Sequence, residues 1–289
     1  MPRALRPAPQ LLRRAAVAGV LLSLLAPAAA LANYISPEDG GSPNANKINT
    51  LYVITLVIAV FIFLLVEGVL IYSLIKFRRR RRDEEPAQIR GNTTLEVGWT
   101  LGAAAILVVL TVVTFIYLPG IKNPEASQPG GLADAHVEYA SLNQPAPPGK
   151  RPYLTINVNG QQYIWRYDYP GAPGSLFSYY DMYVPIRTTV VLNITSSDVI
   201  HSWWVPQLGG KADAVPRHTN HTWFRIDEPG IYTGRCAELC GDNHADMRNR
   251  VIAVTPEQYQ AWAARQRAGI KQSQALLALS RKVRGQQGF

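Results

Sequence analysis

The stretch GRCAELCGDNHADM gathers the side chains of this sequence with the most evident chemistry. Cys236 and Cys240 are the only 2 cysteines of the 289-residue chain. His244 follows four residues after the second cysteine, and Met247 follows three residues later. Upstream, the segment DVIHSWWVPQ supplies His201 at the end of a predicted strand. Thiolate, imidazole and thioether ligands together select copper.

Other interpretations of the two cysteines have to be weighed. A disulfide is the simplest, since the segment is predicted to lie in an oxidising compartment. Zinc is a second, but C-x-x-x-C with one adjacent histidine and a methionine matches no common zinc spacing. A mononuclear blue-copper site uses one cysteine, so this stretch has one too many. Two thiolates can instead bridge two copper ions, with one histidine on each ion and the methionine and a backbone carbonyl as weak outer ligands. His201 by itself, beside two tryptophans, is also typical of a packed core residue.

The first third of the chain predicts a membrane anchor. Residues 1–32 combine arginines, an apolar run and small residues, which is the pattern of a cleavable export signal; an uncleaved signal anchor is the alternative. The apolar runs Leu51–Ile75 and Leu95–Leu118 are each long enough, at about 1.5 Å per residue, to cross a hydrocarbon core of about 30 Å. We therefore expect an external segment over 33–48, transmembrane helices over 49–76 and 95–118, and a basic loop over 77–94.

The charge distribution sets the orientation of this hairpin. Five consecutive arginines, Arg78 to Arg82, place the loop between the helices in the cytoplasm. The N-terminus and everything after residue 118 are then expected on the outer, periplasmic side of the plasma (inner) membrane. The net charge of +9 does not indicate nucleic acid, because residues 122–265 carry 12 Lys and Arg against 13 Asp and Glu, with no basic stripe.

The outer part of the chain changes to short β-type runs. Residues 119–152 are rich in Pro, Gly, Ala and Ser and are predicted to be a linker with a flexible insertion. Residues 153–267 hold predicted strands separated by turn residues, which favours an antiparallel sandwich or barrel. The strands are expected over 153–158, 162–169, 178–184, 188–196, 222–226, 230–234 and 250–254. A terminal helix is expected over 256–267, and residues 268–289 form a basic tail that is either amphipathic helix or disordered.

Taken together, these features resemble the cytochrome c oxidase subunit II family. The resemblance rests on two membrane helices followed by a β domain carrying DVIHSWWVPQLGGKADAVP and GRCAELCGDNHADM, and it covers about residues 49–262. It implies a membrane α plus all-β fold: a two-helix transmembrane hairpin followed by a cupredoxin-like Greek-key β-barrel outside the membrane. It also implies a dinuclear copper (CuA) centre. The residues expected to bind this copper are His201, Cys236, Cys240, His244 and Met247 through side chains, and Glu238 through its carbonyl.

The family also implies partners for this chain. Subunit I would carry the haem, because C-x-x-C-H does not occur here, and subunit III would complete the complex. The Glu238 carboxylate would reach a magnesium ion shared with subunit I. Cytochrome c, soluble or membrane-tethered, would deliver the electrons for reduction of oxygen to water coupled to proton pumping. LEVGWT resembles the family's E-x-x-W-T, which makes Glu96 a candidate for proton uptake; an ordinary N-terminal helix acid is the alternative.

Three positions depart from the family or lack a clear role. GQQYIWRYDY has Tyr163 where the family has the tryptophan that receives the electron, and Trp165 at the second aromatic position. Both are candidates for electron acceptance, or they simply pack under the copper loop. Arg217 stands where the family commonly has glycine, so a different local turn is expected. Glu67 lies roughly 16 Å into the membrane, where it is either functional or a contact with a neighbouring subunit.

The donor's charge is a separate question. The family docks a basic cytochrome c on acids, and Asp168, Asp181 and Asp198 fall at such positions, although aspartates in turns are often only turn formers. Arg166 and Arg187 dilute the patch, which also admits a tethered, fused or less basic donor. Other functions considered are a quinol oxidase subunit, which lacks the copper ligands, a membrane-anchored copper carrier, and the CuA proteins of nitrous or nitric oxide reduction.

Overall fold

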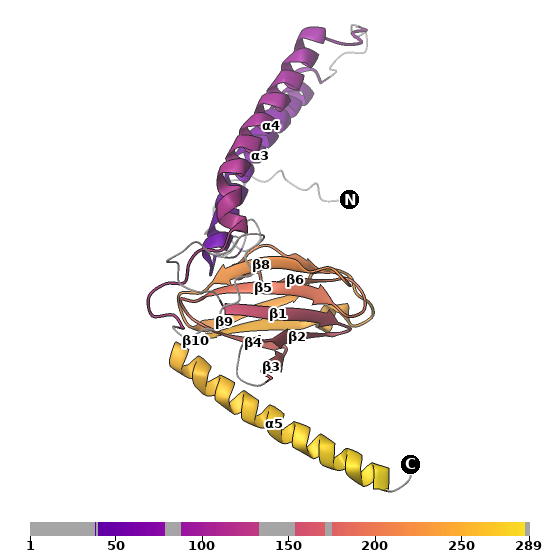
Figure 1. The fold of residues 1–289 in the computed structure, drawn as a ribbon. Coiled ribbons are helices and arrows are strands. Elements are labelled where there is room, and N and C mark those ends of the chain that lie inside the picture. The colour runs from indigo at the N-terminus through magenta and orange to yellow at the C-terminus, as the bar shows by residue number, and fades with distance from the viewer. Residues whose placement is uncertain (1–37, 39, 79–87, 133–153, 171–174, 287–289) are drawn as a thin grey trace, which may run out of the picture. The chain divides into compact units, whose positions relative to one another are not determined.

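The computed structural model describes residues 38, 40–78, 88–132, 154–170 and 175–286. The predicted export signal and the segment Arg79–Arg82 lie outside these residues, as does most of the predicted insertion. Two long helices are followed by two β-sheets and a third long helix (Figure 1). The predicted order of membrane helices and β domain is therefore confirmed.

The helices α3 (Pro43–Lys76) and α4 (Thr93–Lys122) are long and apolar enough to span a membrane. Both extend beyond the ranges predicted from hydropathy, because a helix continues through the polar residues that flank its apolar run. The sequence indicated a stop at Pro119, but α4 continues for one more turn and closes with the Asn123 N–H donating to the Pro119 carbonyl. Where the two helices approach each other, Lys47 Nζ donates to the Gly120 carbonyl at 3.3 Å.

The β domain is a sandwich of two five-stranded sheets. One sheet has the order β3-β2-β1-β5-β8 and the other β4-β10-β9-β6-β7. Most strand pairs are antiparallel, as predicted, but the pairs β1–β5 and β4–β10 are parallel, so the sheets of the sandwich are mixed. The strands are β1 (Leu154–Gln161), β2 (Ile164–Asp168), β3 (Phe177–Tyr179), β4 (Asp181–Pro185), β5 (Thr189–Ser196), β6 (His201–Trp204), β7 (Ala212–Ala214), β8 (Asn220–Arg225), β9 (Gly230–Cys236) and β10 (Arg248–Val254).

The sequence pattern did not predict two features of this sandwich. The single strand predicted over 178–184 is divided at Tyr180, whose φ of +60° turns the chain from β3 in one sheet to β4 in the other. The strands β6 and β7 were not predicted, since β6 is a short buried run without alternation and β7 has only 3 residues. The core between the sheets holds Trp165 and Phe224, which are both 0 % exposed, and Trp203 stacks on Phe224 at 6.1 Å between ring centroids.

The described part of the predicted linker, just after α4, is bonded to the β domain. Thr189 N–H donates to Ser127 Oγ at 3.0 Å, and Thr189 Oγ1 donates to the Glu125 carbonyl at 2.7 Å. The strand β8 is bonded to both membrane helices: Asn44 Nδ2 donates to the Trp223 carbonyl at 2.7 Å, and Trp223 Nε1 donates to the Ile121 carbonyl at 2.8 Å. These bonds tie the β domain to the outer ends of α3 and α4.

One continuous helix, α5 (Pro256–Gln286), ends the described chain. The sequence indicated a helix to Arg267 and left the tail open as amphipathic helix or disordered; its residues are mostly strong helix formers and contain no proline, and the described part of the tail is helical. Its first turns complete the core, with Trp262 stacked on Tyr183 at 4.6 Å between ring centroids.

Candidate metal centre

The strand pairing brings the candidate metal ligands together. His201 is the first residue of β6, rather than the last residue of a predicted strand. β6 pairs with β9 in a register that places Trp203 opposite Cys236, the last residue of β9. The loop that follows folds back, because the Cys236 N–H donates to the Met247 carbonyl at 2.9 Å. His201 and the two ends of the GRCAELCGDNHADM stretch therefore meet at one end of the sandwich.

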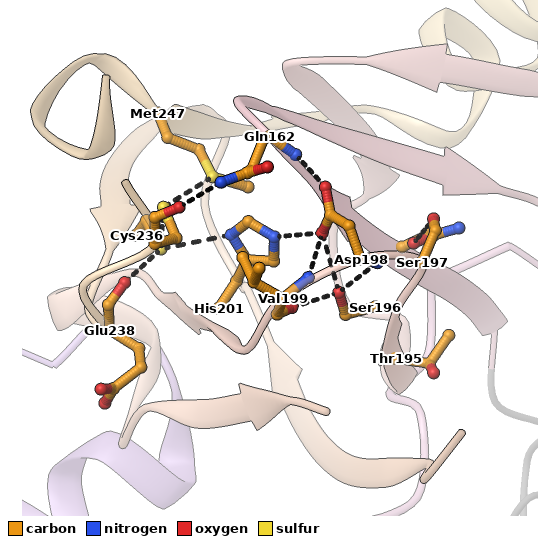
Figure 2. Close-up of polar contacts among 12 residues, drawn as sticks. Gln162, Thr195, Ser196, Ser197, Asp198, Val199, His201, Cys236, Glu238 and Met247 are labelled. Atoms are coloured by element: carbon orange, nitrogen blue, oxygen red, sulfur yellow. Dashed lines mark hydrogen bonds and ion pairs between the residues drawn. The ribbon is translucent and has the colours of Figure 1, made fainter. Parts of the chain in front are cut away.

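The donor atoms lie close together without being bonded (Figure 2). The two sulfurs, Cys236 Sγ and Cys240 Sγ, are 3.9 Å apart. His201 Nδ1 lies 4.0 Å from Cys236 Sγ, and His244 Nδ1 lies 3.5 Å from Cys240 Sγ. Met247 Sδ lies 3.8 Å from Cys240 Sγ. Thus all five side chains predicted as ligands converge on one cluster.

The backbone and the side chain of Glu238, the sixth predicted ligand, face different surroundings. Its carbonyl oxygen lies 3.3 Å from Cys236 Sγ. The carboxylate points away from the cluster (Figure 2) and is exposed. The carbonyl is therefore available to the cluster, and the carboxylate to a neighbour outside it.

The donor set fits a metal rather than a disulfide. Both cysteines are free and buried, and their 3.9 Å separation is far from the roughly 2.05 Å of a disulfide. Two thiolates about 2.3 Å from one metal ion in a tetrahedral arrangement would be about 3.8 Å apart. His201, Cys236 and Cys240 are all buried, with their ligand atoms within 4.8 Å of one another. The cradle therefore has the size and the soft donors of a copper site.

The ionisation of the thiols also favours a cation. Burial raises the pKa of Cys236, but the contacts with His201, with the backbone of Glu238 and Ser202 and with Cys240 together lower it by more, so the net shift is downward. Burial and the neighbouring Cys236 sulfur both raise the pKa of Cys240. One thiol of the pair thus ionises readily, and the second resists because two negative charges would lie side by side. A metal cation in the cradle would remove that penalty.

Asp198 holds the far side of the His201 ring, a role that sequence reasoning missed. His201 Nε2 lies 2.8 Å from Asp198 Oδ1, while Nδ1 faces Cys236 (Figure 2). The Gln162 and Val199 N–H groups each donate to the same carboxylate at 2.7 Å. Burial raises the pKa of Asp198, but these hydrogen bonds and His201 lower it by more. In the sequence, only the D-x-x-H spacing indicated the pair of Asp198 and His201. Asp198 was considered there as an acid for donor docking.

The two aromatic candidates lie at different depths. Trp165 is 0 % exposed, and its ring lies edge-on to His201 with centroids 5.9 Å apart. Tyr163 is half-buried and lies over Gly241, where a Cβ would come 2.5 Å from Tyr163 Oη. Gly241 also has a φ of +128°, which other residues rarely adopt. Gln162 Nε2 donates to the Cys240 carbonyl at 2.6 Å, which further ties this turn to the metal loop.

The acids predicted for donor docking all have partners. Asp168 forms an ion pair with Arg166 at 2.7 Å, and Asp181 forms a two-pronged pair with Arg250 at 2.7 and 2.8 Å. Since Asp198 is bonded to His201, none of the three is an unpaired acid.

The remaining candidates lie outside the cluster. Arg217 keeps the left-handed backbone that glycine favours, with a φ of +62°. Glu96 lies in the first turn of α4 and accepts a hydrogen bond from the Asn92 N–H at 3.1 Å, which is a helix-capping contact. Glu67 is half-exposed within α3.

Comparison with known proteins agrees with this geometry. Residues 31–116 match the family model for the transmembrane domain of cytochrome c oxidase subunit II, and residues 178–254 match the model for its periplasmic domain. Cytochrome c oxidase subunit 2 of Synechocystis sp. is 35% identical over 247 residues, which cover 77% of this chain and 73% of that protein. The Alkalihalophilus pseudofirmus subunit 2 is 33% identical over 243 residues, which cover 83% of this chain but 64% of that protein.

A crystal structure of the periplasmic domain of subunit II of cytochrome oxidase from Bradyrhizobium japonicum is also similar, with 30% identity. The matched region covers 40% of this chain and 94% of that chain, with a TM-score of 0.39. Both halves of the chain thus match models of one family, and relatives at more than 30% identity extend over most of its length. With two membrane-spanning helices, a β domain and a copper-type donor cluster, this chain belongs to the cytochrome c oxidase subunit II family.

Proposed function

We propose that this chain is the electron-accepting subunit of a proton-pumping cytochrome c oxidase, and that its metal centre is a dinuclear copper (CuA) site. The observation that carries the proposal is the convergence of two free thiols, two imidazoles and a thioether, with neighbouring donor atoms 3.5 to 4.0 Å apart. A mononuclear blue-copper site takes a single cysteine. The second thiol therefore favours two copper ions.

The side chains of His201, Cys236, Cys240, His244 and Met247 would hold the copper, together with the Glu238 carbonyl. When bound, the copper pair supplies a one-electron acceptor whose unpaired electron is shared between two ions. The chain supplies the rigidity: Met247 and His201 are 0 % exposed, and Asp198 fixes the His201 ring. Ligands locked by packing keep their positions as an electron arrives and departs, which favours fast transfer.

The remaining roles follow from membership of an oxidase complex. Cytochrome c, soluble or tethered, would deliver electrons outside the inner membrane, where the N-terminus and the β domain would lie. Haem in subunit I would receive them for the reduction of oxygen to water, with subunit III completing the complex. The exposed Glu238 carboxylate is our candidate for a magnesium ion shared with subunit I. Glu96 is our candidate for proton uptake from the cytoplasmic side.

Electrons are proposed to arrive at Tyr163 and to pass through Trp165. Trp165 contacts His201 but is fully buried, so a donor protein cannot touch it. Tyr163 is half-buried against the metal loop and can be reached. The Tyr163→Leu variant should slow the bimolecular reaction with cytochrome c while leaving the copper spectrum intact. An unchanged rate would show that electrons arrive elsewhere.

The first experiment is electron paramagnetic resonance of the full chain, whose thiols are reduced before copper is added. Hyperfine splitting by two equivalent copper nuclei is expected, and Cys240→Ser should abolish it. Ser202→Ala, which changes a buried hydroxyl next to His201, is a matched control that should keep it. A one-copper spectrum from the unchanged chain, or no signal from fully reduced thiols, would overturn the dinuclear assignment.

A further inference from the structure

The C-terminal half of α5, after Ile270, forms a surface that has no partner in the described chain. The helix packs on the sandwich through Tyr259 and Trp262, and Ile270 is the last buried residue up to Arg284, where the description of its side chains ends. Beyond that point Leu276, Leu277, Leu279 and Val283 are 60%, 57%, 59% and 43% exposed. Residues 276, 279 and 283 are spaced to lie on one helix face. The match to the model of the family's periplasmic domain ends at residue 254, just before α5 begins.

After Glu257, every charged residue of α5 is positive. Glu257 is the last acid of the sequence, and no Asp or Glu occurs in residues 258–289. The same stretch carries six cations: Arg265, Arg267, Lys271, Arg281, Lys282 and Arg284. Among the described residues none of these cations forms an ion pair. An exposed apolar stripe framed by unpaired positive charges is complementary to an acidic surface with an apolar patch.

The neighbouring surface of the sandwich extends this basic character. Gln266 Nε2 donates to the Phe177 carbonyl at 2.8 Å, which fixes α5 beside β3. The Arg166 guanidinium lies over the Phe177 ring at 4.6 Å and neutralises Asp168. Arg250 likewise neutralises Asp181 on β4. The acids on this side are thus balanced, and the net charge comes from α5.

The sheet order attaches the first turns of α5 at an edge that, in the described chain, the membrane helices do not contact. α5 contacts β3 and β4, which are edge strands of the two sheets. The membrane helices are bonded to β8, the opposite edge of the β3 sheet. Four strand spacings of about 4.8 Å separate these edges, or about 19 Å. This separation favours a protein as the occupant rather than the lipid surface in which α3 and α4 are anchored.

We propose that α5 beyond Ile270 is a docking helix for an acidic redox protein, an electron donor whose negative surface is attracted to the helix and whose apolar patch covers Leu276, Leu279 and Val283. The docking role deepens the proposed function and rests on it, since a donor is needed only if the metal centre accepts electrons. It also accounts for the pairing of Asp168 and Asp181, because acids left free there would repel such a donor.

The test uses the full copper-loaded chain in lipid nanodiscs and two soluble c-type cytochromes, one acidic and one basic. The variant Lys271→Gln/Arg281→Gln/Lys282→Gln/Arg284→Gln keeps good helix formers and removes four charges. It should lower the association rate constant of the acidic cytochrome about tenfold at low salt, and the difference should shrink at high salt. Leu276→Gln/Leu279→Gln should raise its dissociation rate. The control Lys122→Gln/Lys211→Gln, which removes cations near β7, should change neither rate.

Three outcomes would overturn the docking role. One is an unchanged rate for the acidic cytochrome in the four-charge variant. A second is faster association of the unaltered chain with the basic cytochrome than with the acidic one. A third is loss of binding to anionic phospholipid vesicles by the detergent-solubilised variant with cytochrome binding unchanged, which would assign α5 to lipid. Binding is measured without turnover, so absence of a two-copper spectrum would defeat the proposed function separately.

Discussion

Replacing Asp198 with asparagine tests how the protein tunes its metal centre. The carboxylate lies 2.8 Å from His201 Nε2, and the opposite ring nitrogen lies 4.0 Å from Cys236 Sγ. Asparagine has nearly the same shape and can still accept a hydrogen bond from the imidazole. The substitution therefore removes one negative charge and little else. Since that charge favours the more positive, oxidised metal centre, its removal should raise the reduction potential.

The size of the shift follows from the geometry. The carboxylate and the Cys236 sulfur are at most about 9 Å apart through the ring, which at an effective dielectric constant of about 20 gives about 1.8 kcal/mol. The Asp198 side chain is 31% exposed, so we halve this value to about 1 kcal/mol for solvent screening. For one electron, 59 mV corresponds to about 1.4 kcal/mol, so the expected increase is about 40 mV.

Redox titration of the copper absorption in the full chain measures this shift. The copper spectrum must stay dinuclear and the unfolding temperature must be recorded, because Asp198 also accepts hydrogen bonds from the Gln162 and Val199 N–H groups. Asp213→Asn, which removes an exposed acid from β7, is the matched control and should leave the potential within a few millivolts. An unchanged or lowered potential in Asp198→Asn, with an intact spectrum, would refute the electrostatic reasoning.

Three further predictions concern the pair's pH dependence, the packing around the ring and the membrane acid. In the copper-free chain the pKa of His201 is raised and that of Asp198 lowered, so the pair stabilises the fold below the ordinary histidine pKa of about 6.5 and above the ordinary aspartate pKa of about 3.9. Urea unfolding should therefore show a larger loss of stability in Asp198→Asn at pH 5 than at pH 8, and the opposite order would contradict the pairing. Gly160→Ala would place a methyl group 2.9 Å from His201 Cδ2 and 3.1 Å from Trp165 Cζ3, so it should cost about 1–3 kcal/mol in unfolding free energy and disturb the copper spectrum. Gly269→Ala meets nothing within 4 Å and is its control; equal stability of the two variants would show that the ring can move aside. Glu96→Gln keeps an acceptor for the Asn92 N–H whereas Glu96→Ala does not, so proton uptake predicts that both slow oxygen turnover in the assembled complex with copper intact. Slow turnover in the alanine variant alone would leave Glu96 as a helix cap.

Much of the architecture could be predicted because it depends on local patterns. Two apolar runs of more than 20 residues have few stable alternatives to membrane helices, so α3 and α4 were found and only their ends were misplaced. The ligand types were visible for the same reason: Cys236, Cys240, His244 and Met247 fall within one loop, and their spacing requires no knowledge of the fold.

Contacts between distant segments could be decided only by the tertiary structure. The sequence by itself determined which donors exist, but the β6–β9 register determined that His201 meets Cys236 across 35 residues. Strand β6 is too short and too uniformly buried to show a period, so its residues could not be placed in advance. The same holds for the acids: Asp181 was a candidate for donor docking, and only the parallel pairing of β4 with β10 showed that Arg250 neutralises it. Residue type is a local property and charge balance is not, which is why the sequence indicated a copper site while only the fold showed that the candidate docking acids are paired.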